Sequence, residues 1–295
     1  MVGLATALAL VISINSNEII LRAAEEPVFI YRYTDTPRKP YLMEWYTPNG
    51  VNVLRDAPHD HLHHHGMMYA ITVDGVNYWE ESDTGGYQIH QKISTVHAAP
   101  DADTPGVGFQ EVLLLQGSEF SEPVLKEERS IYHSPLSNGR VRVLTWKSSL
   151  QTASDKEGTV AKISGTVYHG LGMRFPEFMD HSGTFIMADD ETDVFEEGPH
   201  AFAQASWCAY TVEDEETPIT VAMFNCPDNP RPTLWFTMLN PFSYLSATQD
   251  LNRKPMNLKA GEVLSLCYGI AAWDAVVDKS EIEVLYSAWL HSLKK

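Results

Sequence analysis

The sequence predicts an all-β fold, a large antiparallel β-sandwich closed by a helix at the C-terminus. Apolar and polar residues alternate in many short segments, glycines and prolines separate these segments, and a clear helical pattern appears only near the end. Alternation with a period of two is typical of strands, and strands without intervening helices favour an antiparallel sandwich over a βαβ fold. No internal repeat or low-complexity linker divides the chain, so we expect one domain over residues 1–295.

The first strand is expected at Val11–Asn15, where apolar and polar residues alternate. The alternative is that the apolar stretch from Met1 to Ile14 is the core of a signal peptide. Such a core normally follows positively charged residues, but the first basic residue here is Arg22. The strand is therefore the favoured interpretation.

A hairpin is expected where Met68–Val73 and Val76–Trp79 flank Asp74 and Gly75, because Asp-Gly is typical of a two-residue turn. Further strands are expected at 126–133, 140–150, 159–168, 207–212, 219–224, 233–238, 244–248 and 263–272.

The alternation in the strand at 140–150 places Val141 and Val143 on one face and Leu144 and Trp146 on the other. The terminal helix is expected to begin with a capping box at Ser280–Glu283. An apolar stripe follows at Ile282, Leu285, Trp289 and Leu290.

The charge balance narrows the function classes. The chain carries 39 acidic and 21 basic side chains, a formal net charge of -18, which argues against nucleic acid and anionic membranes as partners. No apolar run reaches the roughly 20 residues of a membrane-spanning helix. We expect a soluble protein, cytoplasmic rather than secreted, that binds a small molecule or an oligosaccharide. The three cysteines form no CxxC pair, and we expect them to be reduced and mostly buried.

The most unusual feature is a run of five histidines within seven residues: His59, His61, His63, His64 and His65. Imidazole is the commonest metal ligand and titrates near neutrality, so this run indicates metal binding, anion binding or proton transfer. If the segment is extended, His59, His61, His63 and His65 share one face. If it is helical, His61, His64 and His65 cluster. The alternative is that these histidines only pack and hydrogen-bond a loop.

Other residues are candidates for the same site. His90 follows a glycine pair and is a second candidate for proton transfer. Glu80 and Glu81 follow Trp79, and Glu81 is our candidate for substrate binding, although a solvated turn is an equal alternative. Arg174 follows two glycines and could hold a substrate carboxylate or hydroxyl, or form a structural ion pair. Trp235, like Trp207, could stack on a sugar or belong to the core.

The chain has no Gly-x-Ser-x-Gly elbow, no Walker loop, no Gly-x-Gly-x-x-Gly fingerprint and no His-Glu-x-x-His motif. Nucleotide and dinucleotide chemistry are therefore not expected.

Several motifs resemble the methane oxygenase PmoA family. They are Arg38–Gly50, the block Asp60–Gly66 and Asn77–Trp79, supported by 170–174, Trp207, 229–235, 240–242 and 259–262. The resemblance covers the chain from about Glu26 onward, and its most specific part is the histidine block. Seven residues match positions that recur in the family: Asp60, His61, His63, His64, His90, Arg174 and Trp235.

The chain departs from the family pattern at Leu62, His65 and Met68, where Pro, Arg and Trp are usual. The missing arginine puts a shared contact with an anionic substrate group in doubt. The resemblance implies a sandwich of the galactose-mutarotase type, a family often found beside sugar oxidoreductases. It implies a fold and a pocket rather than methane oxidation, because the membrane enzyme needs spanning helices.

The combined interpretation is a carbohydrate-active enzyme that catalyses epimerisation, elimination or hydrolysis of a sugar or oxidised sugar. His61, His64 and His90 are its candidate catalytic residues, with His64 or His90 moving a proton. His63, Glu81, Arg174 and Trp235 are expected to bind the substrate. A divalent metal ion is a possible cofactor, with His61, His63 and His64 as candidate ligands. The alternatives are a non-catalytic carbohydrate-binding protein and a metal-dependent oxygenase, which needs an open metal site.

Overall fold

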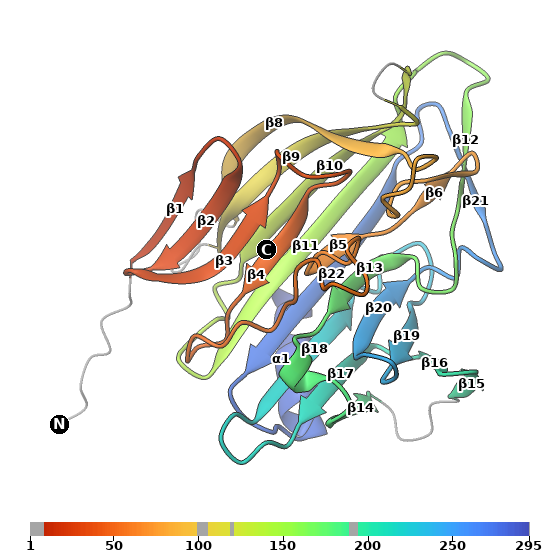
Figure 1. Cartoon of the computed structure of the whole chain (residues 1–295). Coiled ribbons are helices and arrows are strands. Elements are labelled where there is room, and N and C mark those ends of the chain that lie inside the picture. Colours follow the sequence, from red (N-terminus) through yellow and green to blue (C-terminus); the bar gives the residue numbers. More distant parts are fainter. Residues whose placement is uncertain (1–8, 99–105, 119–120, 189–193, 295) are drawn as a thin grey trace.

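The computed structural model describes the chain except residues 1–8, 99–105, 119–120, 189–193 and 295 (Figure 1). The start of the stretch considered as a signal peptide therefore lies outside the described residues. Most of the chain forms antiparallel strands in two large sheets and a small one. The predicted antiparallel β-sandwich with a C-terminal helix is confirmed.

The first large sheet has ten strands. In spatial order they are β1 (Leu10–Ile14), β2 (Glu18–Ala23), β3 (Glu26–Arg32), β4 (Tyr41–Trp45), β5 (Met67–Tyr69), β13 (Gly170–Arg174), β20 (Tyr244–Thr248), β19 (Leu234–Met238), β16 (His200–Gln204) and β15 (Phe195–Glu197). This sheet joins the start of the chain to its second half, since β5 pairs with β13.

The second large sheet has eight strands. They are β14 (Gly183–Met187), β17 (Trp207–Val212), β18 (Ile219–Asn225), β22 (Leu264–Trp273), β11 (Val141–Thr152), β10 (Pro123–His133), β9 (Gly106–Gln116) and β8 (Tyr87–Ala98). A third sheet contains β21 (Met256–Lys259), β12 (Val160–Ser164), β6 (Thr72–Val73) and β7 (Val76–Asn77). A short 3-10 helix, η1, spans Glu177–Met179.

The main core lies between the two large sheets. On β11, Leu144 and Trp146 are buried in this core, whereas Val141 and Val143 pack on the other face, against α1. The two faces predicted for this strand are therefore confirmed. The strand is flanked by β10 and β22, so both of its edges are paired.

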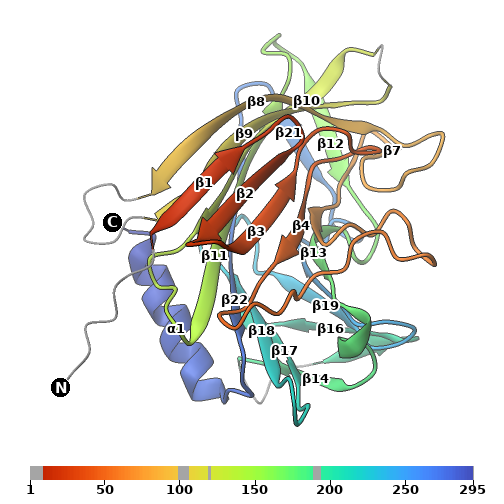
Figure 2. The same ribbon diagram turned by 60° about the vertical axis from the view of Figure 1, so that its left-hand side comes forward.

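The C-terminal helix α1 (Lys279–Ser292) covers the outer face of the eight-stranded sheet (Figure 2). Trp289 is fully buried there, and its indole N–H donates to the Thr145 hydroxyl over 3.0 Å. The predicted cap is wrong by two residues. The N-cap is Asp278, whose carboxylate accepts from the Glu281 backbone N–H over 2.9 Å, and Ser280 donates to that carboxylate.

The predicted hairpin is confirmed at β6 and β7. Asp74 and Gly75 both have positive φ, 50° and 85°, as a tight hairpin turn of this kind requires. The expected strand from Met68 to Val73 is divided, however. Its first half joins the ten-stranded sheet as β5 and its second half joins the small sheet as β6, so one continuous apolar segment serves two sheets.

The outer face of the ten-stranded sheet carries a third apolar cluster. Its side chains alternate with those of the main core: Phe236 and Tyr244 point outward, whereas Trp235 and Leu245 point inward. This outer face is covered by the segments that connect the strands rather than by a second sheet. A cavity forms on this face, with Phe236 and Tyr244 in its lining.

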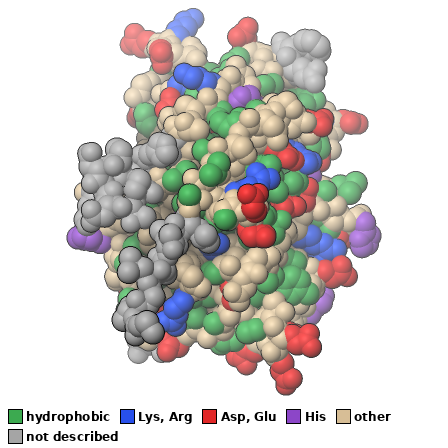
Figure 3. Space-filling view, turned by 90° about the vertical axis from the view of Figure 1, so that its left-hand side faces the viewer, with side chains coloured by type: hydrophobic (Ala, Val, Ile, Leu, Met, Phe, Trp, Pro, Cys, Tyr) green, Lys and Arg blue, Asp and Glu red, His purple; other side chains and the backbone are tan. Residues whose placement is uncertain are grey.

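Three further observations concern the surface charges, the helices and the cysteines. On the face that Figure 3 shows, Asp and Glu side chains are scattered, and Lys and Arg side chains lie singly or in small groups. Within the residues that the structure describes, no helix is long and apolar enough to cross a membrane. The three cysteines are free thiols, and Cys208 and Cys226 are buried.

Candidate functional site

The histidine run folds as a series of tight turns between β4 and β5. The His61 N–H donates to the Pro58 carbonyl and the His64 N–H to the His61 carbonyl, each over 2.9 Å. The Ala57 N–H closes the loop by donating to the His64 carbonyl over 2.8 Å. The segment is thus neither extended nor helical, and successive turns send neighbouring imidazoles in different directions.

Gly66 ends this loop in a conformation that other residues rarely adopt. Its φ is +49°, and a Cβ placed on it would lie 2.2 Å from the Leu42 carbonyl oxygen. Without a side chain at this position, β5 can begin directly beside β4, where Leu42 pairs with Met67. The glycine therefore fixes where the histidine loop returns to the sheet.

Three of the five histidines line one cavity on the outer face of the ten-stranded sheet. Its volume is about 370 Å³, and its lining consists of His61, His63, His64, Trp79, Glu80, Tyr168, His200, Phe236, Met238, Pro241, Phe242 and Tyr244. This volume is within the range of roughly 300–1,000 Å³ that small-molecule sites have. The cavity combines aromatic walls with several imidazoles and a carboxylate.

His64 is packed among these rings. Its ring centroid lies 4.8 Å from that of His61, 5.2 Å from Trp79, 5.3 Å from Phe242 and 5.7 Å from Tyr244. These distances are typical of edge-to-face and tilted aromatic pairs, which hold rings in fixed orientations. The imidazole of His64 is therefore a rigid part of the cavity wall.

The same packing changes the chemistry expected of His64. Burial, together with the nearby His63 and His61, lowers the pKa of His64 to about 2. A neutral imidazole with so low a pKa is a weak base, so the structure does not favour His64 as the group that moves a proton. It remains available as a neutral hydrogen-bonding group. Burial, followed by Lys39 and His61, also lowers the pKa of His63.

Several buried polar atoms of the lining have no partner among the described residues. They are His64 Nδ1, the indole nitrogen of Trp79 and the hydroxyl of Tyr244. Buried polar groups are normally hydrogen-bonded, and each exception in a native structure requires an explanation. All three atoms are buried within the wall of the cavity rather than exposed to its open space.

His61 differs from His64 in two respects. Its side chain is 35% exposed, and its Nδ1 lies 3.0 Å from a carboxylate oxygen of Asp60. Although burial acts in the opposite direction, the hydrogen bond with His61 lowers the pKa of Asp60. A carboxylate on one ring nitrogen orients the imidazole and leaves the other nitrogen for chemistry. Among the lining imidazoles, His61 is the one with this arrangement in the described residues.

His65 faces away from the cavity. Its two ring nitrogens lie 2.6 Å from Asp56 and 2.7 Å from Glu81, and its ring stacks on Tyr41 at 4.4 Å. Burial alone would lower the pKa of His65, but the hydrogen bonds to these two carboxylates raise it. His65 is thus placed as a structural cation between two carboxylates.

Glu81 belongs to the same ion cluster and does not line the cavity. The buried ammonium of Lys39 lies 2.9 Å from Glu81 and donates over 2.7 Å to the Trp79 carbonyl. Burial would raise the pKa of Glu81, but His65 and Lys39 lower it. The substrate-binding role expected for Glu81 is therefore not supported. Its neighbour Glu80 lines the cavity instead.

Arg174 lies behind the cavity wall. Its guanidinium pairs with Asp180 at 3.1 Å, donates to the Ser243 carbonyl at 3.2 Å, and lies 3.8 Å from the Phe242 ring centroid. Only 1% of Arg174 is exposed. It supports the ring of Phe242 and is not placed to touch a substrate directly.

The structure does not bring His90 or Trp235 to the cavity. His90 lies on β8 in the other large sheet, where its Nδ1 is 2.8 Å from the buried carboxylate of Glu111 and its ring packs on Tyr33. Trp235 is fully buried in the main core, and its indole donates to the Ala205 carbonyl over 2.9 Å. Catalytic and substrate-binding roles for these two residues are not supported.

The predicted metal site is not formed by the described residues. No group of three His, Cys, Asp or Glu side chains among them is arranged to hold a metal ion. His61, His63 and His64 line the cavity in packed, differently oriented rings, with centroids 4.7 to 5.9 Å apart. This arrangement also lacks the open two-histidine and one-carboxylate site expected of a metal-dependent oxygenase.

Several lining residues were not predicted from the sequence: Tyr168, His200, Phe236, Met238, Pro241, Phe242 and Tyr244. The sequence does contain a signal for Phe236, Met238 and Tyr244. Strand alternation places them on the face opposite Trp235 and Leu245, but the sequence does not say which face is accessible.

Comparison with known proteins gives the family of the chain. A family model described as "Family of unknown function (DUF6807)" matches residues 18–287. The chain belongs to DUF6807. The resemblance to the methane oxygenase PmoA family is not shown by this match and stays a prediction. A search of curated protein sequences with this chain gives no match.

Solved structures similar to this DUF6807 member include enzymes that act on sugars. The GH36 α-galactosidase AgaB from Geobacillus stearothermophilus is 11% identical with a TM-score of 0.55, covering 90% of this chain and 41% of that one. The GH36 α-galactosidase AgaA from the same organism is 8% identical with a TM-score of 0.50, covering 90% and 40%. A putative aldose 1-epimerase from Klebsiella pneumoniae is 10% identical with a TM-score of 0.48, covering 94% and 81%.

The DUF6807 member thus spans less than half the length of the α-galactosidases that it resembles. At these identities the similarity shows the fold alone.

Proposed function

We propose that this protein is a carbohydrate-active enzyme that transfers protons on a small sugar, with epimerisation as the favoured reaction. One observation carries the proposal: His61, whose ring nitrogen is bonded to Asp60, and Glu80 line the same cavity as several aromatic side chains. The fold shared with the GH36 α-galactosidases agrees with a sugar substrate.

The walls suit a sugar ring. Trp79 and Phe242 contribute apolar ring atoms to the cavity wall, which suit the C–H groups of a pyranose. His63 and His64, kept uncharged by burial, can donate to or accept from sugar hydroxyls. A neutral substrate also agrees with the acidic chain, because no charged ligand has to approach a net charge of -18.

The catalytic step assigned to this site is general acid–base catalysis. Epimerisation needs one group that removes a proton from the sugar and another that returns a proton on the opposite side. We assign these roles to His61, oriented by Asp60, and to Glu80. Elimination can use the same two groups. Hydrolysis with two catalytic carboxylates fits less well, because Glu80 is the one carboxylate in the described lining.

The proposal is tested by incubating the protein with a panel of aldoses and uronic acids in D2O and following the products by proton NMR. Epimerisation through carbon deprotonation predicts a new epimer with deuterium at the inverted carbon. His61→Ala should lower the rate by about 10²–10⁴-fold. His59→Ala is the matched control, because His59 is exposed in the same loop and does not line the cavity.

Binding without turnover would support the alternative of a non-catalytic carbohydrate-binding protein. Turnover that is unchanged in His61→Ala would remove His61 from the mechanism and overturn the acid–base assignment.

A further inference from the structure

We propose that Cys226 and Cys267 form a redox modification site, at which hydrogen peroxide converts the two thiols into a reversible disulfide. Cys226 directly follows β18 and Cys267 lies within β22, so the site belongs to the eight-stranded sheet and not to the sugar cavity. Both residues are free thiols in the structure. The inference is independent of the proposed function.

The register of the sheet brings the two cysteines opposite each other. Asn225 on β18 pairs with Tyr268 on β22, and the next position of this ladder places Cys226 beside Cys267. The Cys226 N–H accordingly donates to the Cys267 carbonyl over 3.3 Å. Opposite residues of a hydrogen-bonded antiparallel pair have Cα atoms about 5.5 Å apart. Disulfides join Cα atoms that are roughly 4.4–6.8 Å apart, so the pair meets the requirement for a cross-link.

The two side chains lie on the same face of the sheet. Residues two apart on a strand share a face, and Cys226 and Cys267 pack with Phe224 and Ala271 in the apolar cluster beneath α1. The Cys267 S–H donates a hydrogen bond to the sulfur of Cys226. Asn229 fixes the backbone beside them: its Oδ1 accepts from the Cys267 N–H over 2.7 Å, and its Nδ2 donates to the Cys267 carbonyl over 3.0 Å.

Cys226 is the sulfur that we expect to react first. The hydrogen bond from Cys267 lowers the pKa of Cys226 to about 6, although burial acts in the opposite direction. The same hydrogen bond, together with burial, raises the pKa of Cys267. Lys147, which pairs with Cys267 on β11, also favours the Cys226 thiolate, whereas the charge of Asp228 opposes it. Because the thiolate is the nucleophilic form, Cys226 is reactive at neutral pH.

The exposure of the pair favours a small oxidant. Cys226 is 5% exposed and Cys267 is partly exposed, so a molecule of the size of hydrogen peroxide suits the site better than a bulky disulfide. Cys208 provides the contrast within the same chain. It is fully buried on β17, and burial raises its pKa. We therefore expect Cys208 to remain a thiol under the same conditions.

The oxidation proceeds in two steps. The Cys226 thiolate attacks one oxygen of hydrogen peroxide, the O–O bond breaks and hydroxide leaves, which gives a sulfenic acid. The sulfur of Cys267 then attacks the sulfenic sulfur, the S–O bond breaks, and the hydroxyl leaves as water with the Cys267 proton. Each sulfur gives up one electron, and the peroxide accepts both. A dithiol reductant reverses the reaction by thiol–disulfide exchange.

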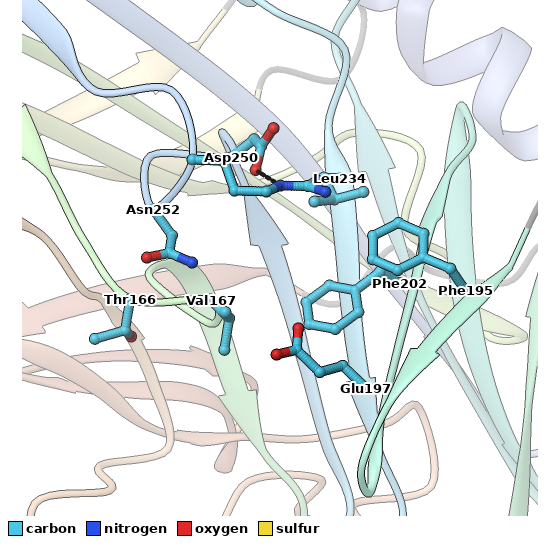
Figure 4. Close-up of a pocket in the computed structure, with 9 residues that line it drawn as sticks. Thr166, Val167, Phe195, Glu197, Phe202, Leu234, Asp250 and Asn252 are labelled. Carbon is cyan, nitrogen blue, oxygen red and sulfur yellow. Dashed lines mark hydrogen bonds and ion pairs between the residues drawn. The ribbon is translucent and has the colours of Figure 1, made fainter.

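The disulfide would close a loop that carries part of the sugar cavity. The chain between the two cysteines contributes five residues to its lining: Phe236, Met238, Pro241, Phe242 and Tyr244. Within this segment, Asp250 and Asn252 line a small hollow, and Asp250 pairs with Arg253 at 2.7 Å (Figure 4). Because the segment is already folded in the reduced protein, the cross-link would act mainly by restricting the unfolded chain.

The test is treatment of the full chain with a small molar excess of hydrogen peroxide, then alkylation of free thiols and peptide mass mapping without reductant. The expected result is a Cys226 peptide joined to the Cys267 peptide, with Cys208 still alkylated. Dithiothreitol should restore both thiols. The oxidised protein should melt at least about 5 °C above the reduced protein. Cys226→Ala and Cys267→Ala should each abolish the cross-link and this rise.

Cys208→Ala is the matched control, because it removes a thiol outside the pair and should keep the cross-link. The site is refuted if peroxide leaves both thiols free, oxidises Cys226 without joining it to Cys267, or links two chains instead. A cross-link that leaves the melting temperature unchanged would refute its effect on stability. The mapping uses the unaltered sequence, so a variant that fails to fold does not affect the decision.

Discussion

The Nε2 atom of His65 lies 2.7 Å from a carboxylate oxygen of Glu81, and this contact joins the two segments that supply His61, His63, His64, Trp79 and Glu80 to the cavity wall. His65 ends the histidine loop, and Glu81 follows Trp79 and Glu80. Nδ1 of His65 is bonded in turn to Asp56, at the start of the loop. An imidazole between two carboxylates donates through both nitrogens only when protonated. The structure therefore uses a charged histidine to hold the neutral histidines in place.

Replacing His65 is expected to destabilise the protein most at low pH. The unfolded chain loses this proton near pH 6.5, whereas the folded protein, with a raised pKa, keeps it to higher pH. The stabilisation is complete below pH 6.5 and is lost as the pH rises through the folded pKa. His65→Ala should lower the free energy of unfolding by about 3 kcal/mol at pH 6, measured by urea denaturation.

Leu62→Ala is the control for this measurement, because Leu62 is 63% exposed in the same loop. A His65→Ala effect that grows between pH 6.5 and 9 would contradict the assignment of His65 as a buried cation.

His64 is expected to stay neutral over the range in which free histidine titrates. Burial, with His63 and His61 nearby, holds its pKa at about 2, so its imidazole ¹⁵N shifts should not change between pH 8 and pH 4. In urea the same residue should titrate near its ordinary value of 6.5. Because the unfolded state takes up the proton first, His64 makes folding less favourable as the pH falls below 6.5, by up to about 1.4 kcal/mol per pH unit.

A midpoint above pH 5 in the folded protein would show that the ring of His64 is in contact with solvent. His64 would then again be a candidate for the residue that transfers the proton.

The position of Tyr244 in the cavity wall depends on Gly172. A Cβ at this glycine would lie 1.9 Å from the Tyr244 hydroxyl oxygen across two paired strands. Gly172→Ala should therefore destabilise the protein by about 1–3 kcal/mol and displace Tyr244. Thermal unfolding tests this against Gly139→Ala, where a Cβ meets nothing within 4 Å. Equal melting temperatures for both variants would contradict the close packing.

Asp60 is expected to act on catalysis through His61 as a positioning residue. Asp60→Asn should lower kcat at least about tenfold while KM changes little, because the amide no longer fixes the tautomer of the ring. Glu177→Gln is a suitable control, since it removes a carboxylate 84% exposed outside the lining. A change in KM alone would assign Asp60 to binding instead.

The sequence predicted the architecture well where local patterns decide it. The Asp74-Gly75 turn and the two faces of the strand around Trp146 follow from turn chemistry and alternation, and both are confirmed. The cap of α1 was placed two residues late because Asp278 and Ser280 are both good cap residues.

The site was harder to predict because it is assembled from distant segments. The histidine run reaches the cavity as expected for His61, His63 and His64, but the sequence does not show that β8 carries His90 into the other sheet. Trp235 lies one residue from Phe236 on β19, and a shift of one residue on a strand reverses the face. Which face is accessible depends on the loops that cover the sheet, and no local pattern gives this.

The central claim is that the cavity lined by His61, Trp79 and Phe242 binds a sugar. Its most direct test is a crystal structure of the protein soaked with a mixture of neutral mono- and disaccharides. We expect a sugar ring in this cavity, against the aromatic walls and within hydrogen-bonding distance of His61. A sugar bound at another place on the fold, with this cavity filled only by water, would contradict it.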